Sequence, residues 1–174
     1  MELARPLPLQ LESLDLNKAL RELLELHEEQ LTAQKIQVNQ DLAPDLPPIL
    51  GDSKRLHRCL GNFLSNALQA MPQGGELTIQ TSRLEASLLP DPARPREDLT
   101  PVVQVRVRDT GVGIPADRFP KIFDPFYTTK EEGLGMGMAI AHRIIEDHKG
   151  TVDVESAVGA GTTFTLCFPV RTGL

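Results

Sequence analysis

Hydrophobic and polar residues alternate along the first part of the chain in patterns that predict a strand, a helix and a second strand. Residues 9–14 have the alternation of a short strand. Asp15 can cap a helix over residues 16–33, whose apolar positions fall on one face when each residue is advanced by 100°. His27 lies within this apolar stripe, so we interpret it as a packed structural histidine rather than as a phosphoacceptor. Residues 36–42 predict the second strand.

A second helix, capped by Asp52 or Ser53 and ending at about Met71, has two well separated faces. One face is apolar and predicts burial in the core. The other face carries polar side chains at helical spacing, namely Arg55, Arg58, Asn62, Asn66 and Gln69. Because its two asparagines are one turn apart on the polar side, this helix is well placed to line a binding site.

The rest of the chain predicts four strands and one helix. The strands are expected around residues 77–81, 103–107, 152–156 and 163–168, and the helix over residues 138–149. Residues 85–101 carry four prolines and predict a long exposed loop, and residues 118–137 show little periodicity. We therefore predict one α/β domain with helices on one face of a mainly antiparallel sheet.

Composition and charge narrow the classes of function. With 174 residues the chain fits one domain, and its net charge of −6 argues against a broad interface with nucleic acid. No apolar run approaches the roughly 20 residues of a membrane span, and residues 1–10 do not have the pattern of a signal or transit peptide. Cys59 and Cys167 lie far apart in apolar stretches, which predicts buried reduced thiols and a reducing, cytoplasmic setting.

The positions of the glycines are more informative than their number. Eight of the 13 glycines lie between Gly111 and Gly161, most of them in three groups. The first group (109–115) directly follows a predicted strand, the second (133–137) directly precedes a predicted helix, and the third (159–163) directly precedes the last strand. Glycine permits positive φ and lets backbone amides approach a ligand, and a glycine run that opens a helix adds the partial positive charge of the helix N-terminus. That combination suits a phosphate.

Two common nucleotide-binding patterns do not fit this chain. The Walker sequence G-x-x-x-x-G-K-[ST] occurs nowhere in it. A dinucleotide fingerprint at residues 111–116 would need a following strand that ends in a ribose-binding acid, but residues 121–133 are irregular. We therefore reject both the P-loop and the Rossmann interpretation.

Four motifs, taken in order, resemble the N, G1, F and G2 boxes of sensor histidine kinases. They are Asn62-Phe-Leu-Ser-Asn66, Asp109-Thr-Gly-Val-Gly113, Phe123-Asp-Pro-Phe-Tyr-Thr-Thr-Lys130 and Gly133-Leu-Gly-Met-Gly137. The resemblance covers about residues 9–169 and is to the catalytic and ATP-binding domain of the nitrogen-regulator-like branch. It implies the GHKL, or Bergerat, fold shared with gyrase and MutL. In this α+β fold, a two-layer α/β sandwich, a mixed and mainly antiparallel sheet is covered on one face by about three helices and carries a flexible ATP lid.

The resemblance also implies a set of residues that bind ATP. They are Asn62, Asn66, Asp109, Gly111, Gly113, Lys130, Gly133, Leu134, Gly135, Met136, Gly137 and Thr162. By resemblance, the Asp109 carboxylate accepts from the adenine N6 amino group, with simple capping of a turn as its alternative role, and Thr162 supports the same edge through a water. Asn66 resembles the family's Mg²⁺ ligand, and Asn62 faces the same pocket. ATP-hydrolysing relatives have a glutamate base where Asn62 stands, which favours phosphoryl transfer over hydrolysis.

The implied lid region carries the remaining candidates. Backbone amides of the second glycine group are expected around the phosphates, and Lys130, or more weakly Arg118, can bring positive charge to the γ-phosphate. A merely solvated Lys130 is the alternative. Three aromatic residues are expected to pack as anchors of the lid: Phe123, Phe126 and Tyr127. His142 and His148 are expected at the surface or at a helix end.

One departure from the family pattern concerns the asparagine helix. Many relatives carry a basic residue three positions after the magnesium asparagine, followed by tyrosine, where this chain has Gln69 and Ala70. This difference weakens any assignment of a phosphate contact or a base-stacking contact to that end of the helix.

The resemblance implies a division of the chain and a role for it. Residues 1–8 correspond to a linker from a dimerisation hairpin, residues 9–170 to the catalytic and ATP-binding domain, and residues 171–174 to a C-terminal tail. None of the four histidines lies in a phosphoacceptor motif. We therefore expect a monomeric cytoplasmic domain that uses ATP and Mg²⁺, with Asn62, Asn66 and Lys130 as catalytic residues.

Its expected acceptor is a histidine on a separate dimerisation domain, with a response regulator downstream. Two other functions stay open. One is an ATPase of the gyrase or MutL type, and the other is a serine-directed regulatory kinase or nucleotide-sensing module.

Overall fold

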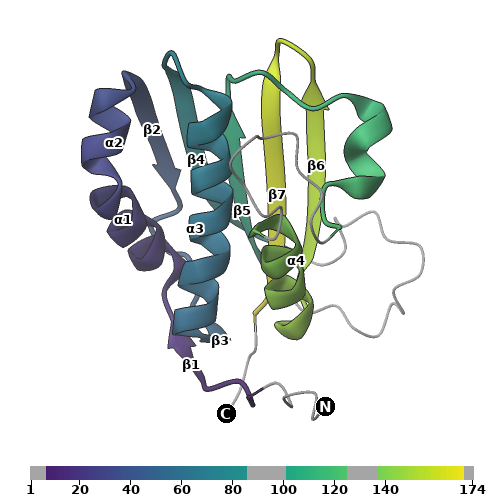
Figure 1. Cartoon of the computed structure of the whole chain (residues 1–174). Coiled ribbons are helices and arrows are strands. Elements are labelled where there is room, and N and C mark those ends of the chain that lie inside the picture. The colour runs from purple at the N-terminus through teal and green to yellow at the C-terminus, as the bar shows by residue number, and fades with distance from the viewer. Residues whose placement is uncertain (1–6, 86–100, 125–136, 171–174) are drawn as a thin grey trace.

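A computed structural model describes residues 7–85, 101–124 and 137–170 of the chain. The elements in chain order are β1 (Leu11–Leu14), α1 (Leu16–Leu26), α2 (Glu28–Ala33), β2 (Ile36–Leu42), β3 (Ile49–Asp52), α3 (Ser53–Ala70), β4 (Gly75–Leu84), β5 (Val102–Asp109), the 3₁₀ helix η2 (Ala116–Lys121), α4 (Gly137–Asp147), β6 (Thr151–Ala157) and β7 (Gly161–Pro169). The four α-helices lie on one face of a five-stranded sheet (Figure 1). This two-layer α+β arrangement is the predicted one, with one more α-helix than the three expected in the described residues.

The five strands of the main sheet lie in the order β2-β4-β5-β7-β6. β2 is parallel to β4, and every other neighbouring pair is antiparallel, so the expected mixed and mainly antiparallel sheet is confirmed. The first predicted strand is different. β1 pairs with β3 in a separate two-stranded sheet, with Leu11 opposite Asp52 and Leu14 opposite Ile49. The sequence pattern does not predict β3, because its four residues are too few to show an alternation between the prolines and α3.

The helix predicted over residues 16–33 is wrong as one continuous element. It breaks at His27, which has φ −102° and ψ 8° and separates α1 from α2. The ring Nδ1 of His27 donates to the carbonyl oxygen of Leu23 at 2.8 Å, and Glu28 and Glu29 lie in the first turn of α2. Acidic side chains interact favourably with the partial positive charge of a helix N-terminus, so Glu28 and Glu29 stabilise the start of a second helix, α2. The structural role predicted for His27 is confirmed, as a helix-end residue that is half-buried.

The boundaries of the later helices differ only slightly from the predicted ones. Asp52 caps α3, with its Oδ1 accepting from the backbone N–H of Arg55 at 3.2 Å. α4 starts at Gly137, one residue earlier than predicted, and ends at Asp147, two residues earlier. A 3₁₀ helix, η2, occupies part of the region that shows no periodicity. None of the helices in the described ranges is long and apolar enough to cross a membrane.

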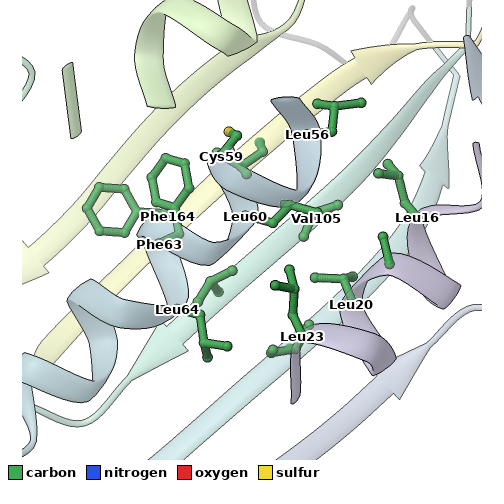
Figure 2. Packing of buried hydrophobic residues seen from close by; sticks show 14 of the residues in the cluster. Leu16, Leu20, Leu23, Leu56, Cys59, Leu60, Phe63, Leu64, Val105 and Phe164 are labelled. Carbon is green, nitrogen blue, oxygen red and sulfur yellow. The ribbon is translucent and has the colours of Figure 1, made fainter. Parts of the chain in front are cut away.

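The hydrophobic core lies between the helices and the sheet (Figure 2). α1 contributes Leu16, Leu20 and Leu23, which face leucines of α3 across the layer. Phe63 of α3 meets Phe164 of β7 with ring centroids 5.0 Å apart at 60°, a tilted packing that aromatic rings favour. Because the apolar face of α3 packs in this core, the opposite, polar face of the helix is oriented away from it.

The two cysteines are buried free thiols, as predicted. Burial raises the pKa of the Cys59 thiol to about 12. The Cys59 Sγ lies 3.6 Å from the carbonyl oxygen of Ala141, so this side chain packs between α3 and α4. A thiol in this environment is a packing residue and not a nucleophile.

A buried polar cluster joins α1 to the sheet. The Asn17 Nδ2 donates to the carbonyl oxygen of Ala43 at 2.7 Å, and its Oδ1 accepts from the Thr81 hydroxyl at 2.8 Å. The Thr81 oxygen in turn accepts from the backbone N–H of Ala43 at 2.9 Å. Each of these polar atoms has a partner, so the cluster is stable without water.

Replacing Asn17 with alanine is expected to lower the free energy of unfolding by about 2 kcal/mol, because the Thr81 hydroxyl and the Ala43 carbonyl then lose their buried partners. Urea unfolding of the purified chain measures this change. Lys18→Ala is the control, since Lys18 is the next residue of the same helix and its side chain is 74% exposed. Equal losses in the two variants would show that the cluster adds nothing beyond helix propensity.

Candidate ATP-binding site

The site begins with a carboxylate at the end of the central strand. Asp109 is the last residue of β5, lies opposite Leu77 of β4 and Thr162 of β7, and is 3% exposed. Its Oδ1 accepts from the backbone N–H of Gly111 at 2.8 Å. Burial raises the pKa of Asp109, and the amides of Gly111 and Thr162 offset part of this rise. An ionised carboxylate offers about four acceptor positions, so capping the turn and accepting from a ligand are compatible roles.

The first glycine loop is clamped between α3 and β6 by close backbone contacts. A Cβ at Gly111 would lie 2.4 Å from the carbonyl oxygen of Ala70, to which the N–H of Val112 donates at 3.1 Å. Gly113 has φ +76°, and a Cβ there would lie 2.0 Å from the carbonyl oxygen of Ala157. Both positions therefore require glycine, for the close approach at each and for the left-handed backbone at Gly113.

Ser156 is a site residue that sequence analysis missed. Its Oγ accepts from the N–H of Ile114 at 2.7 Å, donates to the carbonyl oxygen of Gly161 at 2.9 Å, and lies 2.8 Å from the Thr162 Oγ1. A serine hydroxyl has one hydrogen, so Thr162 is the donor in the last bond and its oxygen keeps its acceptor capacity. The sequence shows Ser156 only as an ordinary position of an alternating strand, and nothing in that pattern distinguishes it.

Asn62 and Asn66 lie at the other end of the site, on the polar side of α3. The Asn62 Nδ2 donates to the carbonyl oxygen of Gly137, the first residue of α4, at 3.0 Å. Asn66 is one turn further along and half-buried. From Asn62 to Ala70, which touches the glycine loop, α3 rises about 12 Å. One helix therefore connects the Asp109 end of the site with the start of α4.

The structure gives the positions of only some of the predicted site residues. It brings Asp109, Gly111, Gly113 and Thr162 together at one end, and Asn62 and Gly137 together at the other. Several predicted residues lie outside the described ranges: Phe126, Tyr127, Lys130, Gly133, Leu134, Gly135 and Met136. The weaker candidate Arg118 lies exposed in η2.

Two histidines of the last helical region differ in their surroundings. His142 is 38% exposed and stacks on Phe123 with ring centroids 4.8 Å apart, which agrees with a packing role for Phe123. His148 follows α4, as expected of a helix-end residue, but it is only 7% exposed. A surface role for His148 is therefore wrong, because its ring is enclosed by the start of α3.

Residues 51–172 match the family model described as histidine kinase-, DNA gyrase B- and HSP90-like ATPase. The chain belongs to this ATPase family. The match includes both ends of the site and supports ATP as the ligand of this domain.

Sequence relatives of this ATPase-family domain include the sensor histidine kinase ZraS of Escherichia coli strain K12. The two are 37% identical over 171 residues, which is 98% of this chain and 34% of ZraS. The chain thus spans about a third of the length of that curated relative.

Solved structures of histidine kinases share the fold. Full-length ShkA in complex with AMPPNP superimposes with a TM-score of 0.79 and 28% identity, over 98% of this chain and 33% of ShkA. The catalytic domain of ThkA gives a TM-score of 0.76 at 28% identity, over 92% of this chain and 95% of that domain. ThkA in complex with the response regulator TrrA gives 0.72 at 26% identity, over 94% of this chain and 42% of that chain. This ATPase-family domain therefore has the fold of a histidine kinase catalytic domain.

Proposed function

We propose that this domain binds Mg-ATP and transfers its γ-phosphoryl group to a histidine on a separate dimerisation domain, as the catalytic domain of a sensor histidine kinase. The observation that carries the proposal is Asn62, whose amide donates to the carbonyl of Gly137 at the start of α4. An amide does not act as a general base, so the site has no side chain there to activate a water. The similarity to ZraS, ShkA and ThkA supports the same conclusion.

The base of the nucleotide is proposed to bind at the Asp109 end of the site, and the phosphates at the end where α4 begins. The buried Asp109 carboxylate accepts from the adenine N6 amine, whereas guanine has a carbonyl oxygen at that position and is repelled. The Thr162 oxygen accepts from a water at the same edge. Backbone amides of Gly133, Gly135 and Gly137 and their neighbours Leu134 and Met136 surround the phosphates, and Lys130 brings charge to the γ-phosphate.

The donor chemistry of the described site fits Mg²⁺ only when a triphosphate is present. Asn66, with Asn62 beside it, would supply neutral amide oxygens, and the described residues hold no group of three His, Cys, Asp or Glu side chains able to bind a metal ion. Mg²⁺ accepts few protein ligands when phosphate oxygens and waters complete its octahedron. When bound, it neutralises charge on the phosphates.

The proposed reaction is an in-line displacement at the γ-phosphorus. A neutral nitrogen of the acceptor histidine forms the new N–P bond, and the bond from the γ-phosphorus to the β–γ bridging oxygen breaks, so that ADP leaves with the electron pair. The domain holds and orients the donor. The acceptor is proposed to come from another domain, because none of the four histidines lies in a phosphoacceptor motif and His148 is enclosed.

We further propose residues 9–170 as the catalytic unit, acting as a monomer in the cytoplasm, where ATP is available as the donor. A response regulator is the proposed downstream partner, by analogy with the complex of ThkA and TrrA. Residues 1–8 and 171–174 are proposed as a linker and a tail.

The test is incubation of the chain with Mg²⁺, γ-labelled ATP and the phosphoacceptor hairpin of ZraS. Label is expected on the hairpin, stable in alkali and labile in acid, as a phosphohistidine is. The chain alone is expected to bind Mg-ATP and to carry no acid-labile label. Substitution of the acceptor histidine in the hairpin is the control and is expected to remove the label.

Three outcomes would contradict the proposal. Acid-stable, alkali-labile label would indicate a serine-directed kinase. Steady release of phosphate above roughly 1 s⁻¹ by the chain alone would indicate an ATPase. Acid-labile label on the isolated chain would show that it contains its own acceptor.

A further inference from the structure

α3 and α4 run antiparallel and are joined at successive turns along their length. Asn62 contacts Gly137 at the start of α4, and Cys59 contacts Ala141 in its middle. At the far end, the backbone N–H of Asp52 donates to the Nε2 of His148 at 3.0 Å. α4 is therefore held along α3 from the ATP site to the opposite end of the domain.

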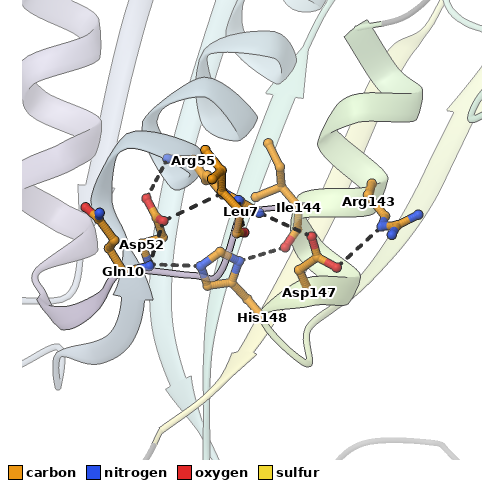
Figure 3. A network of polar contacts seen from close by, with 8 residues as sticks. All are labelled: Leu7, Gln10, Asp52, Arg55, Arg143, Ile144, Asp147 and His148. Carbon is orange, nitrogen blue, oxygen red and sulfur yellow. Dashed lines mark hydrogen bonds and ion pairs between the residues drawn. The ribbon is translucent and has the colours of Figure 1, made fainter. Parts of the chain in front are cut away.

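Arg55 lies at this opposite end and contacts three parts of the chain (Figure 3). Its Nε lies 3.7 Å from the Asp52 Oδ2, and its Nη1 lies 3.7 Å from the Oδ2 of Asp147, the last residue of α4. Its Nη2 donates to the carbonyl oxygen of Leu7 at 2.6 Å. One guanidinium thus joins the start of α3, the end of α4 and residues 7–10, which we call the N-terminal segment.

Asp52 makes a second connection between the same three parts. Its Oδ2 accepts from the backbone N–H of Gln10 in the N-terminal segment at 3.0 Å. Desolvation raises the pKa of Asp52, but the amides of Gln10 and Arg55 and the charge of Arg55 together hold it below its usual value. The carboxylate is therefore charged at neutral pH, and it keeps both the segment and Arg55 in place.

The end of α4 is held through two neighbouring residues, Asp147 and the following His148. The Oδ1 of Asp147 lies 3.4 Å from the Arg143 Nε, so this carboxylate is oriented within α4 before it meets Arg55. The His148 Nδ1 donates to the carbonyl oxygen of Ile144 at 2.7 Å, which leaves Nε2 as the acceptor for the N–H of Asp52. The junction of Asp52, Arg55, Asp147 and His148 is thus a connected polar network, and the N-terminal segment is part of it.

We propose that Arg55 is a positioning residue for nucleotide binding, because it ties the N-terminal segment to the end of α4, whose other end forms part of the ATP site. Displacement of the segment removes a partner of Arg55, loosens the end of α4 and shifts Gly137 relative to Asn62. The N-terminal segment thereby regulates the affinity for ATP. This inference rests on the proposed function, since it needs ATP phosphates at the start of α4.

Coupling of this kind is reciprocal. If the position of the N-terminal segment changes the affinity for ATP, ATP must stabilise the docked segment by the same factor. A merely structural ion pair would show no such response. Arg55 is 28% exposed and Asp147 30%, and pairs this accessible to water add little to global stability.

The experiment measures both directions in the whole chain. Calorimetry gives the Mg-ATP dissociation constant of the wild type, Arg55→Gln and Arg55→Lys. Hydrogen exchange of the backbone amides of Gln10 and Asp52 is measured with and without Mg-ATP. The matched control is Arg83→Gln, which also removes an arginine of a surface ion pair, 3.4 Å from Glu85 and far along β4.

Arg55→Gln is expected to weaken ATP binding by about fivefold or more, and Arg83→Gln is expected to leave it unchanged. Arg55→Lys keeps the charge but not the planar fork, so it is expected to fall between the wild type and Arg55→Gln. In the wild type, Mg-ATP is expected to slow exchange at Gln10 and Asp52, and in Arg55→Gln this protection is lost.

The possible results distinguish a failure of the inference from a failure of the proposed function. A wild-type chain that does not bind Mg-ATP contradicts the proposed function. A wild-type chain that binds Mg-ATP with no change in exchange at Gln10 and Asp52 overturns the inference alone, even if Arg55→Gln fails to fold. Equal ATP affinity in a folded Arg55→Gln variant also overturns it.

Discussion

Replacing Gly113 with alanine is expected to weaken ATP binding by more than about 100-fold. The new Cβ would lie 2.0 Å from the carbonyl oxygen of Ala157, and the residue has φ +76°. An L-residue in the left-handed region costs roughly 1–2 kcal/mol, but a backbone oxygen at this distance cannot be accommodated by rotating a side chain. The loop must move away from β6, and Asp109 at its base moves with it.

The control for this variant is Gly159→Ala. Gly159 also has a positive φ, +81°, but no atom lies within 4 Å of a Cβ built there. This variant therefore has the backbone strain without the collision. It is expected to lose about 1 kcal/mol of stability and to keep its affinity for ATP.

Calorimetry with Mg-ATP and urea unfolding of both variants check this prediction. Gly113→Ala is expected to unfold cooperatively, because the core between the helices and the sheet is built from other elements and only Ile114 of the loop packs against it. Similar affinities in the two variants would show that the contact between the glycine loop and Ala157 does not shape the nucleotide site.

Replacing Asp109 with asparagine is expected to weaken ATP binding by ten- to a hundredfold. A hydrogen bond to a charged group contributes about 1.5–3 kcal/mol, and asparagine keeps only one neutral oxygen for the amides of Gly111 and Thr162 and for the adenine amine. The matched control is Asp153→Asn, which neutralises an exposed carboxylate on β6 of the same sheet. It is expected to leave ATP binding unchanged.

Base selectivity tests the role of Asp109 more sharply than affinity does. Inosine triphosphate has a carbonyl oxygen in place of the adenine amine and keeps the triphosphate unchanged. The wild type is expected to prefer ATP strongly over inosine triphosphate, and Asp109→Asn is expected to lose most of this preference. If the variant binds both nucleotides more weakly by the same factor, Asp109 supports the loop and does not contact the base.

The raised pKa of Asp109 adds a pH dependence with a definite sign. The folded chain binds this proton more tightly than the unfolded chain, so its contribution to stability is full below the unfolded pKa and is lost as pH rises through the folded pKa. ATP binding needs the ionised form. Affinity for ATP is therefore expected to fall as pH falls through the raised pKa, and Asp109→Asn is expected to lack this change.

The glycine pattern and the polar face of α3 indicated a phosphate site, and the resemblance to sensor histidine kinases supplied the individual ATP-binding residues, which stay predictions. The structure brings Asp109, Gly111 and Gly113 together at the end of β5, where the glycine pattern after a predicted strand had placed them. Asn62 was predictable from its position opposite the apolar stripe of α3. Ser156 was not predictable, because its three hydrogen bonds connect segments that have no relation along the chain.

Local periodicity was enough to predict the fold class, the long helix α3 and the strands of the main sheet, since burial of one face imposes a period of 3.6 or 2 residues. Two features depended on long-range contacts. β1 pairs with β3 outside the main sheet, and Arg55 joins the N-terminal segment to the end of α4. Each of them depends on which distant groups meet a polar side chain or a strand edge. Such partners cannot be identified from the sequence, because nearly every residue carries hydrogen-bond donors and acceptors. Only the folded chain brings particular ones together.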